Sequence, residues 1–405
     1  MDEKVLVLYT KTASLNPTPP SLYAALEAMT SKDVIALDVG RVSLDRIRNS
    51  LTEADAITID AQLLNARYFQ PPHGESVVFE RWRGLRFYEE LVEFVFKASA
   101  PKVLISSGLD LHWTGPENDY LFQALDSLAG MTWTGSTQTP DLSEIPDSWV
   151  DDWMLKFPRV NEVKQTIAAT GTILIEFPGA ISEREFRTPR HPVWDISIGG
   201  VPYNTRRLAR SSAERRNLSV APYRSTARAF DFLGRRMPRR LNTYRSAREM
   251  NRLRYRNLRF SVTRSKIAWT DGSAYRYAIR KFFEIPAWGT PLICLPHSKM
   301  ADFGFLENCH YISAEPEQVG GIVAHWLASS ELREQLASMG RRAQSVVWQS
   351  HTSTARASQL LWSIRHLLRD SDCTFGWREG RFTKIDQASG EKHSAAWSRS
   401  DEGIT

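Results

Sequence analysis

Short apolar segments alternate with amphipathic ones through the first half of the chain. The apolar segments are rich in Val, Ile and Leu and have the length of buried strands, whereas the segments between them repeat with a helical period. Such alternation is typical of a parallel sheet with helices on both faces. The expected strands are 5–9, 34–39, 56–60 and 102–106, and the expected helices are 22–29, 44–51 and 79–98. The sequence therefore predicts an α/β fold.

The same pattern continues to the end of the second half, and 405 residues are enough for two domains. Further strands are expected at 129–135, 172–177, 194–198, 265–269, 291–295 and 311–312, and further helices at 275–283, 319–328, 331–338 and 352–368. Turn-forming and charged residues at 177–192 indicate an interdomain linker. We predict four parts: a first domain at 1–180, a second at 194–348, a terminal helix at 349–369 and a polar, disordered tail at 370–405.

Composition indicates an ordinary globular protein with an anionic partner. The net charge is +6 and the hydrophobic content is 42%. A basic balance favours a phosphate-bearing ligand, an anionic membrane surface or nucleic acid, although a solvated basic surface explains it equally well. The chain opens directly into an expected strand, without a cleavable signal or an apolar run long enough to span a bilayer. Three cysteines form no metal or disulfide pattern, so we expect a cytoplasmic location.

The stretch 280–293 carries the most specific chemistry. It reads as a short amphipathic helix, a stop at Gly289 and a buried strand, and Glu284 lies on the helix just before the turn. In an open α/β sheet that turn faces the ligand crevice. A carboxylate there can accept hydrogen bonds from both hydroxyls of a diol, whereas the alternative is a solvated acid at a helix end.

Glycine turns and basic residues surround this stretch in a pattern that suits a diphosphate. Phosphate binding needs positive charge and free backbone N–H groups, which Gly turns and helix N-termini supply. The candidate donor-binding residues are Gly199, Gly200, Asp271, Gly272, Ser273, Arg276, Arg280, Lys281 and Glu284. For the glycines the alternative is an ordinary strand-to-helix turn, and for Lys281 it is an i, i+3 ion pair with Glu284.

The order of these elements resembles the donor-binding domain of two-domain glycosyltransferases of the GT-B fold, with the closest likeness to the group 1 type that includes the CgeB-like spore-maturation proteins. The resemblance covers about 194–368, and 265–291 is its most specific part. It implies two Rossmann-like domains that face a central cleft, with the terminal helix crossing back to the first domain. It also implies transfer of a hexose-type sugar from a nucleotide sugar to a hydroxyl of a glycan, a lipid-linked acceptor or a cell-surface polysaccharide, with retention of configuration and without a cofactor or metal.

The resemblance also assigns roles to single residues. Glu284 stands where the family has an acid that accepts hydrogen bonds from the donor ribose, and Lys281 stands where relatives more often carry Arg. Many GT-B transferases have a second acid eight positions before the first, but this chain has Arg276 there. An Arg side chain accepts no hydrogen bond from a sugar, although it can bind phosphate. The identity of the sugar is therefore left open.

On the acceptor side, Asp110 and His112 follow the expected strand 102–106 and are our candidates for catalysis. A His there would serve as a general base because its pKa is near neutrality. The alternative is a loop acid and a surface His.

Two other functions agree with parts of the sequence. The Arg276 substitution favours a GT-B-like protein that binds a nucleotide or glycan without catalysis. The Arg-rich segment 206–259, interleaved with aromatic residues, would suit nucleic acid, although it contains no recognised motif and we expect no specific nucleic-acid partner. The basic charge also suits peripheral contact with an anionic membrane.

Overall fold

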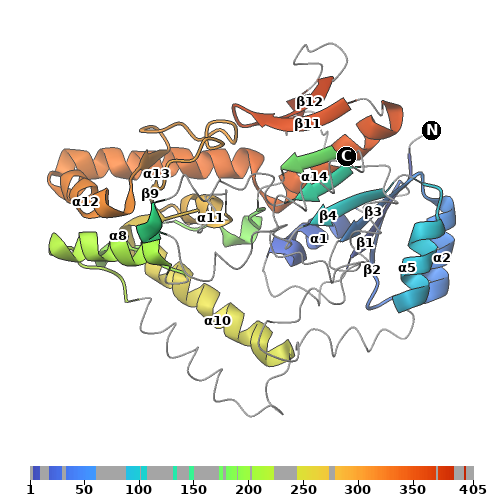
Figure 1. Ribbon diagram of the computed structural model, residues 1–405, viewed down its shortest axis with the longest axis horizontal. Helices are drawn as coiled ribbons and strands as arrows, with labels where there is room; N and C mark the ends of the chain where they lie inside the picture. Colours follow the sequence, from blue (N-terminus) through green and yellow to red (C-terminus); the bar gives the residue numbers. More distant parts are fainter. Residues whose placement is uncertain are drawn as a thin grey trace.

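We analysed a computed structural model of the chain. It describes residues 3–9, 18–29, 33–60, 88–100, 102–106, 131–134, 146–149, 173–176, 179–188, 190–200, 203–222, 244–272, 279–370, 373–386 and 396–397. All statements below concern these residues. Two parallel sheets lie side by side, with long helices packed around them (Figure 1).

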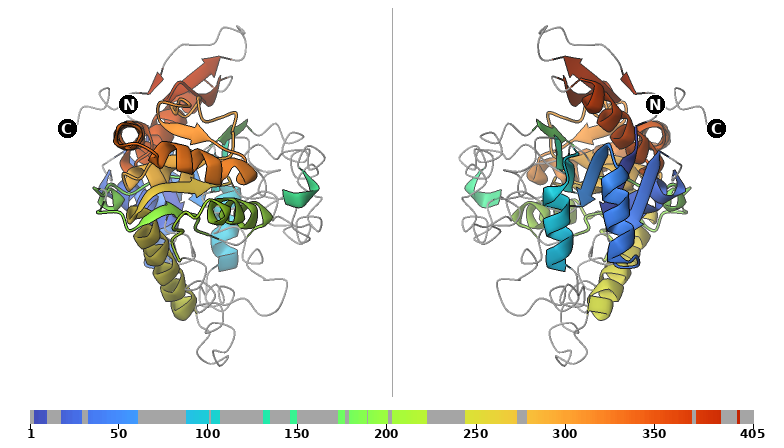
Figure 2. Two further views of the ribbon diagram at one scale, coloured as in Figure 1. Left: turned by 90° about the vertical axis from the view of Figure 1, so that its left-hand side faces the viewer. Right: turned by 90° about the vertical axis from the view of Figure 1, so that its right-hand side faces the viewer.

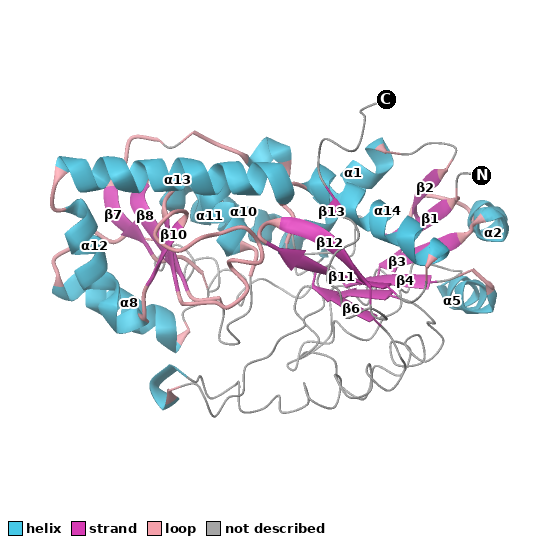
Figure 3. Cartoon of the chain, turned by 90° about the horizontal axis from the view of Figure 1, so that it is seen from above, coloured by secondary structure: helices cyan, strands magenta, loops and turns pink. Residues whose placement is uncertain are grey.

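The first sheet is wholly parallel, with strand order β2-β1-β3-β4-β5-β6. Its strands are β1 (Val5–Tyr9), β2 (Val34–Asp38), β3 (Ala56–Asp60), β4 (Lys102–Ser106), β5 (Met131–Thr134) and β6 (Ile173–Glu176). Every residue of β1 and β3 is buried, because both strands lie inside the sheet and under helices. Helix α1 (Thr18–Ala28) covers one face, while α2 (Leu44–Glu53) and α5 (Tyr88–Lys97) cover the other (Figures 1 and 3).

The second sheet is also parallel, with strand order β10-β9-β8-β7. Its strands are β7 (Trp194–Ser197), β8 (Ser265–Thr270), β9 (Leu292–Cys294) and β10 (Tyr311–Ser313). Around it pack α8 (Asn204–Arg215), α10 (Tyr244–Thr263), α11 (Lys281–Ala287), α12 (Val319–Leu327) and α13 (Ser330–Ser350). Short 3-10 turns occur at Asp147–Trp149, Glu183–Glu185 and Pro316–Gln318. The predicted α/β fold with two parallel sheets is confirmed.

The terminal helix α14 (Ser353–Arg369) returns to the first domain, as predicted. It packs against α1, and Arg369 Nε donates to Glu3 Oε1 at 2.8 Å (Figure 2 shows the two domains end-on). Helix α13 is longer than the predicted 331–338 and continues through Gly340. A Cβ at position 340 would lie 3.2 Å from Gly289 O and from Pro291, so the glycine allows α11 and its turn to approach the helix closely.

The prediction of a disordered tail is wrong for residues 373–386. Strands β11 (Cys373–Arg378), β12 (Arg381–Asp386) and β13 (Ala396–Trp397) form an antiparallel sheet. The side chains of Phe375, Trp377 and Phe382 are buried against the body of the protein. The segment is poor in aliphatic residues, but Phe375 and Trp377 have the two-residue spacing of a strand with one buried face.

None of the helices that the structure describes combines the length and the apolar character needed to cross a bilayer.

The tip of the hairpin formed by β11 and β12 gives a stability prediction, because Gly380 at this tip lies against Gly304. Gly304 has φ +90°, and a Cβ there would lie 2.8 Å from Gly380 Cα, so backbone would have to move. We expect Gly304→Ala to lower the free energy of unfolding by about 1–3 kcal/mol, as measured by urea denaturation. Gly321→Ala is the control, because a Cβ there meets nothing within 4 Å inside α12. It should be neutral or slightly stabilising. Equal stability of the two variants would contradict the close packing of the hairpin.

Candidate functional site

The carboxyl ends of the second sheet bring two predicted turns together. Strands β7 and β8 are parallel neighbours, so the residues that follow them lie at one edge. Gly199 and Gly200 follow β7, whereas Asp271 and Gly272 follow β8. In an open α/β sheet this edge is where ligands bind.

Gly200 lies beside two cationic side chains. Its φ is +126°, and a Cβ at this position would lie 2.1 Å from Arg206 Nη1 and 2.2 Å from Lys281 Nζ. The Lys281 ammonium donates to Gly199 O at 3.2 Å. Three of the predicted donor-binding residues therefore meet, together with Arg206 from the first turn of α8. We call Gly200, Arg206 and Lys281 the cationic cradle.

Asp271 was predicted as a donor-binding residue, and in the structure its carboxylate makes contacts within the protein. Its carboxylate is fully buried and accepts hydrogen bonds from Arg206 Nη2 at 2.5 Å and from Thr205 Oγ1 at 2.8 Å. Burial acts to raise the pKa of Asp271, but the charges of Arg206 and Lys281 and the Thr205 hydroxyl hold it below its usual value. The carboxylate thus ties the start of α8 to the end of β8 and holds Arg206 in place.

Lys281 is the most perturbed cation of the cradle. Burial and the neighbouring Arg206 charge lower the pKa of Lys281 to about 7, although Asp271 and Glu284 oppose the shift. Two cations so close together repel each other, and the binding of an anion between them would relieve that repulsion. The cradle is therefore a candidate anion site. When no anion is bound, Lys281 titrates near neutral pH.

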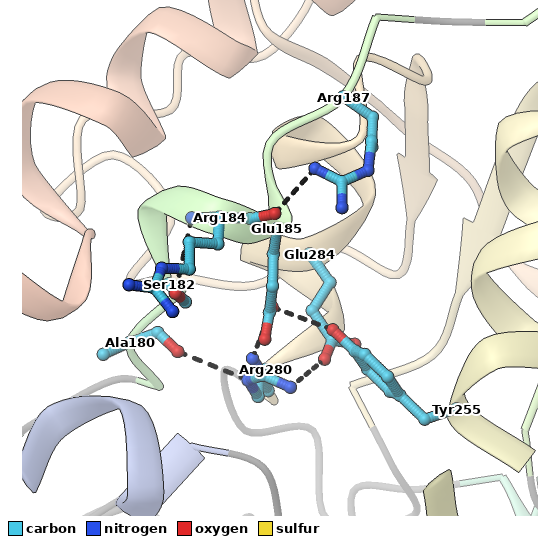
Figure 4. Close-up of polar contacts among 8 residues, drawn as sticks. All are labelled: Ala180, Ser182, Arg184, Glu185, Arg187, Tyr255, Arg280 and Glu284. Carbon is cyan, nitrogen blue, oxygen red and sulfur yellow. Dashed lines mark hydrogen bonds and ion pairs between the residues drawn. The ribbon is translucent and has the colours of Figure 1, made fainter. Parts of the chain in front are cut away.

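Glu284 belongs to a second, buried network (Figure 4). Its Oε1 pairs with Arg280 Nη1, and Arg280 Nη2 also pairs with Glu185 Oε2 at 2.7 Å. Tyr255 donates its hydroxyl to Glu185 Oε2 at 2.9 Å, and Arg280 Nε donates to Ala180 O at 3.3 Å. Burial, opposed by the Arg280 charge, raises the pKa of Glu284.

Helix α11 therefore differs from the expected amphipathic helix, and the alternative of a solvated acid at position 284 does not hold. Its residues from Phe282 to Ala287 are all buried, and Glu284 is only 3% exposed. The helix is enclosed because it packs between the second sheet and α13. Glu284 forms its ion pair with Arg280, four residues earlier. Lys281 instead donates to Gly199 O, within the cradle.

Four important side chains were not chosen from the sequence as site residues. Thr205 and Arg206 were missed because their contact with Asp271 spans 65 residues of chain or more. Glu185 was assigned to the linker, and Tyr255 to an Arg-rich segment. A Gly turn followed closely by Arg206 was the one local signal that pointed to the cradle.

Some candidates lie outside the described residues, namely Asp110, His112, Ser273 and Arg276. Within the described part of the chain, no group of three or more His, Cys, Asp or Glu side chains gathers as metal ligands. The expected absence of a metal remains a prediction.

Comparison with protein families identifies the second domain. Residues 195–362 match the family model described as glycosyl transferase-like (Glyco_trans_1_2). This stretch of the chain is therefore similar to glycosyl transferases, as predicted. The match spans both the cradle and Glu284. The two parallel sheets, together with the returning helix α14, form the predicted GT-B arrangement. The finer likeness to CgeB-like proteins stays a prediction. No curated protein matches the chain.

Solved structures with a similar arrangement are distant in sequence. HepE of Anabaena, determined in complex with UDP, is 10% identical with a TM-score of 0.48, over 90% of this chain and 100% of that one. Sucrose-phosphate synthase from Thermosynechococcus elongatus is 11% identical with a TM-score of 0.44, over 91% and 99%. A glycosyltransferase from Rickettsia africae is 9% identical with a TM-score of 0.46, also over 91% and 99%. All three scores are below 0.5, so the description of the fold rests on the sheets and helices above.

The Glu284 network gives a second stability prediction. Arg280→Ala would leave the buried Glu284 carboxylate and the partly exposed Glu185 without their shared cation, which should cost about 3–5 kcal/mol of unfolding free energy. Arg369→Ala removes an exposed ion pair with Glu3 and should cost about 0–1 kcal/mol. Urea denaturation of both variants measures the difference. A cost for Arg280→Ala as small as that for Arg369→Ala would show that the network does not stabilise the domain.

Proposed function

We propose that the protein transfers a sugar from a nucleotide-sugar donor to an acceptor hydroxyl. The observation that carries this proposal is the cationic cradle at the carboxyl edge of the second sheet, within a domain of the glycosyl transferase-like family. A diphosphate is the part of such a donor that needs two cations and a glycine turn.

In this proposal the cradle binds the donor diphosphate. Gly200 lets the phosphate approach the backbone, and the Arg206 guanidinium and Lys281 ammonium contact its oxygens. When the anomeric C–O bond to the diphosphate breaks, negative charge grows on the leaving oxygen, and both cations stabilise it. The acceptor oxygen forms the new bond to the anomeric carbon and loses its proton to a base, for which Asp110 and His112 remain our candidates.

We propose Glu284 as the ligand of the donor ribose. Its carboxylate is buried and one oxygen is engaged by Arg280, so the ribose must displace that ion pair in part. Glu185 makes this exchange possible, because it already contacts the same guanidinium at 2.7 Å. Arg280 would then shift toward Glu185 while Glu284 accepts from the ribose hydroxyls.

The family likeness supports the remaining parts of the proposal. We propose retention at the anomeric carbon, no requirement for a metal, and a glycan, lipid-linked glycan or cell-surface polysaccharide as acceptor. Arg276, the position at which the sequence departs from the family, leaves the identity of the sugar open.

A donor screen tests the proposal. We expect one or more nucleoside diphosphates to raise the melting temperature, because a ligand of the native state stabilises it. The matching nucleotide sugar should be consumed, with sugar transferred to a hydroxyl acceptor. Lys281→Met should weaken diphosphate binding by about tenfold or more, since a charge-assisted contact is lost. Lys299→Met, at an exposed ion pair, is the control. Stabilisation without turnover on any acceptor would favour a non-catalytic binding protein, and the absence of any stabilisation would contradict the donor site.

The perturbed Lys281 predicts a pH dependence. With a pKa of about 7 in the free protein, Lys281 is charged below pH 7 and largely neutral above it. A bound diphosphate favours the charged form, so affinity for a nucleotide sugar should be highest below pH 7 and fall as the pH rises through it. Isothermal titration across this range measures the effect. Lys281→Arg should flatten the profile because Arg does not titrate there, and an equally steep profile in that variant would contradict the assignment to Lys281.

A further inference from the structure

Apolar side chains gather on the outer surface beside α10. Within the described part of the chain, five large hydrophobic residues are exposed, and three of them belong to this surface: Val193 at 53%, Leu253 at 42% and Phe260 at 48%. Val193 precedes Trp194, whose ring meets Phe260 edge-on at 5.9 Å. Exposed apolar groups gathered in this way mark an interaction site more often than scattered ones do.

The outward side of α10 is a defined helical face. Leu253, Arg256, Asn257 and Phe260 have the spacing i, i+3, i+4 and i+7, which places them in one stripe. The eight residues from Leu253 to Phe260 extend about 10 Å along the helix axis. The opposite side holds Leu258 and Val262, which are buried in the core. Helix α10 is thus apolar inward and carries a second, mixed stripe outward.

Arg256 belongs to the outward stripe, and further arginines flank it. Five arginines lie between residues 250 and 264, and no acid lies among them: Arg252, Arg254, Arg256, Arg259 and Arg264. Arg252 and Arg256 are exposed, and the Arg264 guanidinium lies 5.6 Å from the centre of the Phe260 ring. Asp195, next to Trp194, is engaged by Lys266 at 2.7 Å. Figures 1 and 2 show α10 extending outward from the second domain.

We propose that this face of α10, with Val193, binds the surface of an anionic lipid membrane. An interfacial helix needs Leu, Phe or Trp side chains that enter the acyl boundary and basic side chains that meet anionic head groups. Both are present in one stripe. A nucleic acid fits less well, because only Phe260 of the three exposed apolar side chains offers a ring on which a base could stack.

Docking by this face would also orient the proposed donor site. Tyr255, on the inward side of the same helix, donates to Glu185 in the Glu284 network, and its ring meets Trp288 at 5.6 Å. A lipid surface on the outside of α10 therefore lies one helix thickness from that network, about 10–12 Å. The membrane proposal itself is independent of transferase activity, and its test measures binding alone.

Vesicle co-sedimentation of the full-length protein tests the proposal. We expect binding to vesicles of phosphatidylcholine mixed with phosphatidylglycerol, little binding to phosphatidylcholine alone, and weaker binding as salt is added. The double variant Leu253→Ser with Phe260→Ser should lower the partition coefficient by about tenfold or more. Arg256→Glu should lower it as well, through charge.

Leu306→Ser is the matched control, because Leu306 is equally exposed, at 55%, but lies outside this surface. Its vesicle binding should equal that of the unmodified protein, and all variants should keep its melting temperature. Absence of binding to the mixed vesicles at low salt would overturn the proposal. Equal losses of vesicle binding in the double variant and in the Leu306 control would also overturn it. A third contradicting result would be binding to a random single-stranded oligonucleotide that is tighter than binding to the vesicles and is unchanged in the double variant.

Discussion

A single buried guanidinium holds the candidate site together. Arg280 pairs with Glu284 on its own helix and with Glu185 on the interdomain linker, and it donates to Ala180 O. Burial raises the pKa of Glu284, and the Arg280 charge opposes that effect. By fixing the first turn of α11, the pairing also fixes Lys281, the next residue, beside Gly200. The linker, the donor helix and the cradle therefore depend on one side chain.

The second buried pair, Arg206 with Asp271, has a comparable effect at the sheet edge. Asp271 accepts hydrogen bonds from Thr205 and Arg206 at the start of α8, so both of its oxygens are engaged within the protein. An unpaired acid at this position would repel a phosphate, but the Asp271 charge orients an arginine toward the glycine turn. The result places the Arg206 guanidinium and the Lys281 ammonium together beside the glycine turn, where both would attract an anion.

Helix α10 connects this interior to the surface. Its inward side carries Tyr255 to the Glu185–Arg280 network, and its outward side presents Leu253, Arg256 and Phe260. The arginine-rich composition of the segment therefore has no single explanation. The residues of the two sides are interleaved in sequence and are separated only by the helical period.

The strands of both sheets were predictable from sequence because their signal is local. Segments such as 5–9, 56–60 and 102–106 are short apolar runs, and the structure reproduces these bounds. The glycine turns and Lys281 were also predicted, because the residue types that bind phosphate are few. The hairpin at 373–386 was missed, since its burial rests on two aromatic side chains rather than on an aliphatic run.

The sequence by itself thus determined the α/β class and the strands of both sheets, which follow from periodicity, while the returning terminal helix was implied by its resemblance to GT-B glycosyltransferases. Only the tertiary structure decided that Asp271 anchors α8, that Glu284 is buried with Arg280 and Glu185, and that Arg206 completes the cradle. These contacts join residues 65 or more positions apart, apart from the Arg280–Glu284 pair. Which partner a charged side chain chooses at such separations depends on how the sheet and helices pack, and that information is absent from any local stretch of sequence.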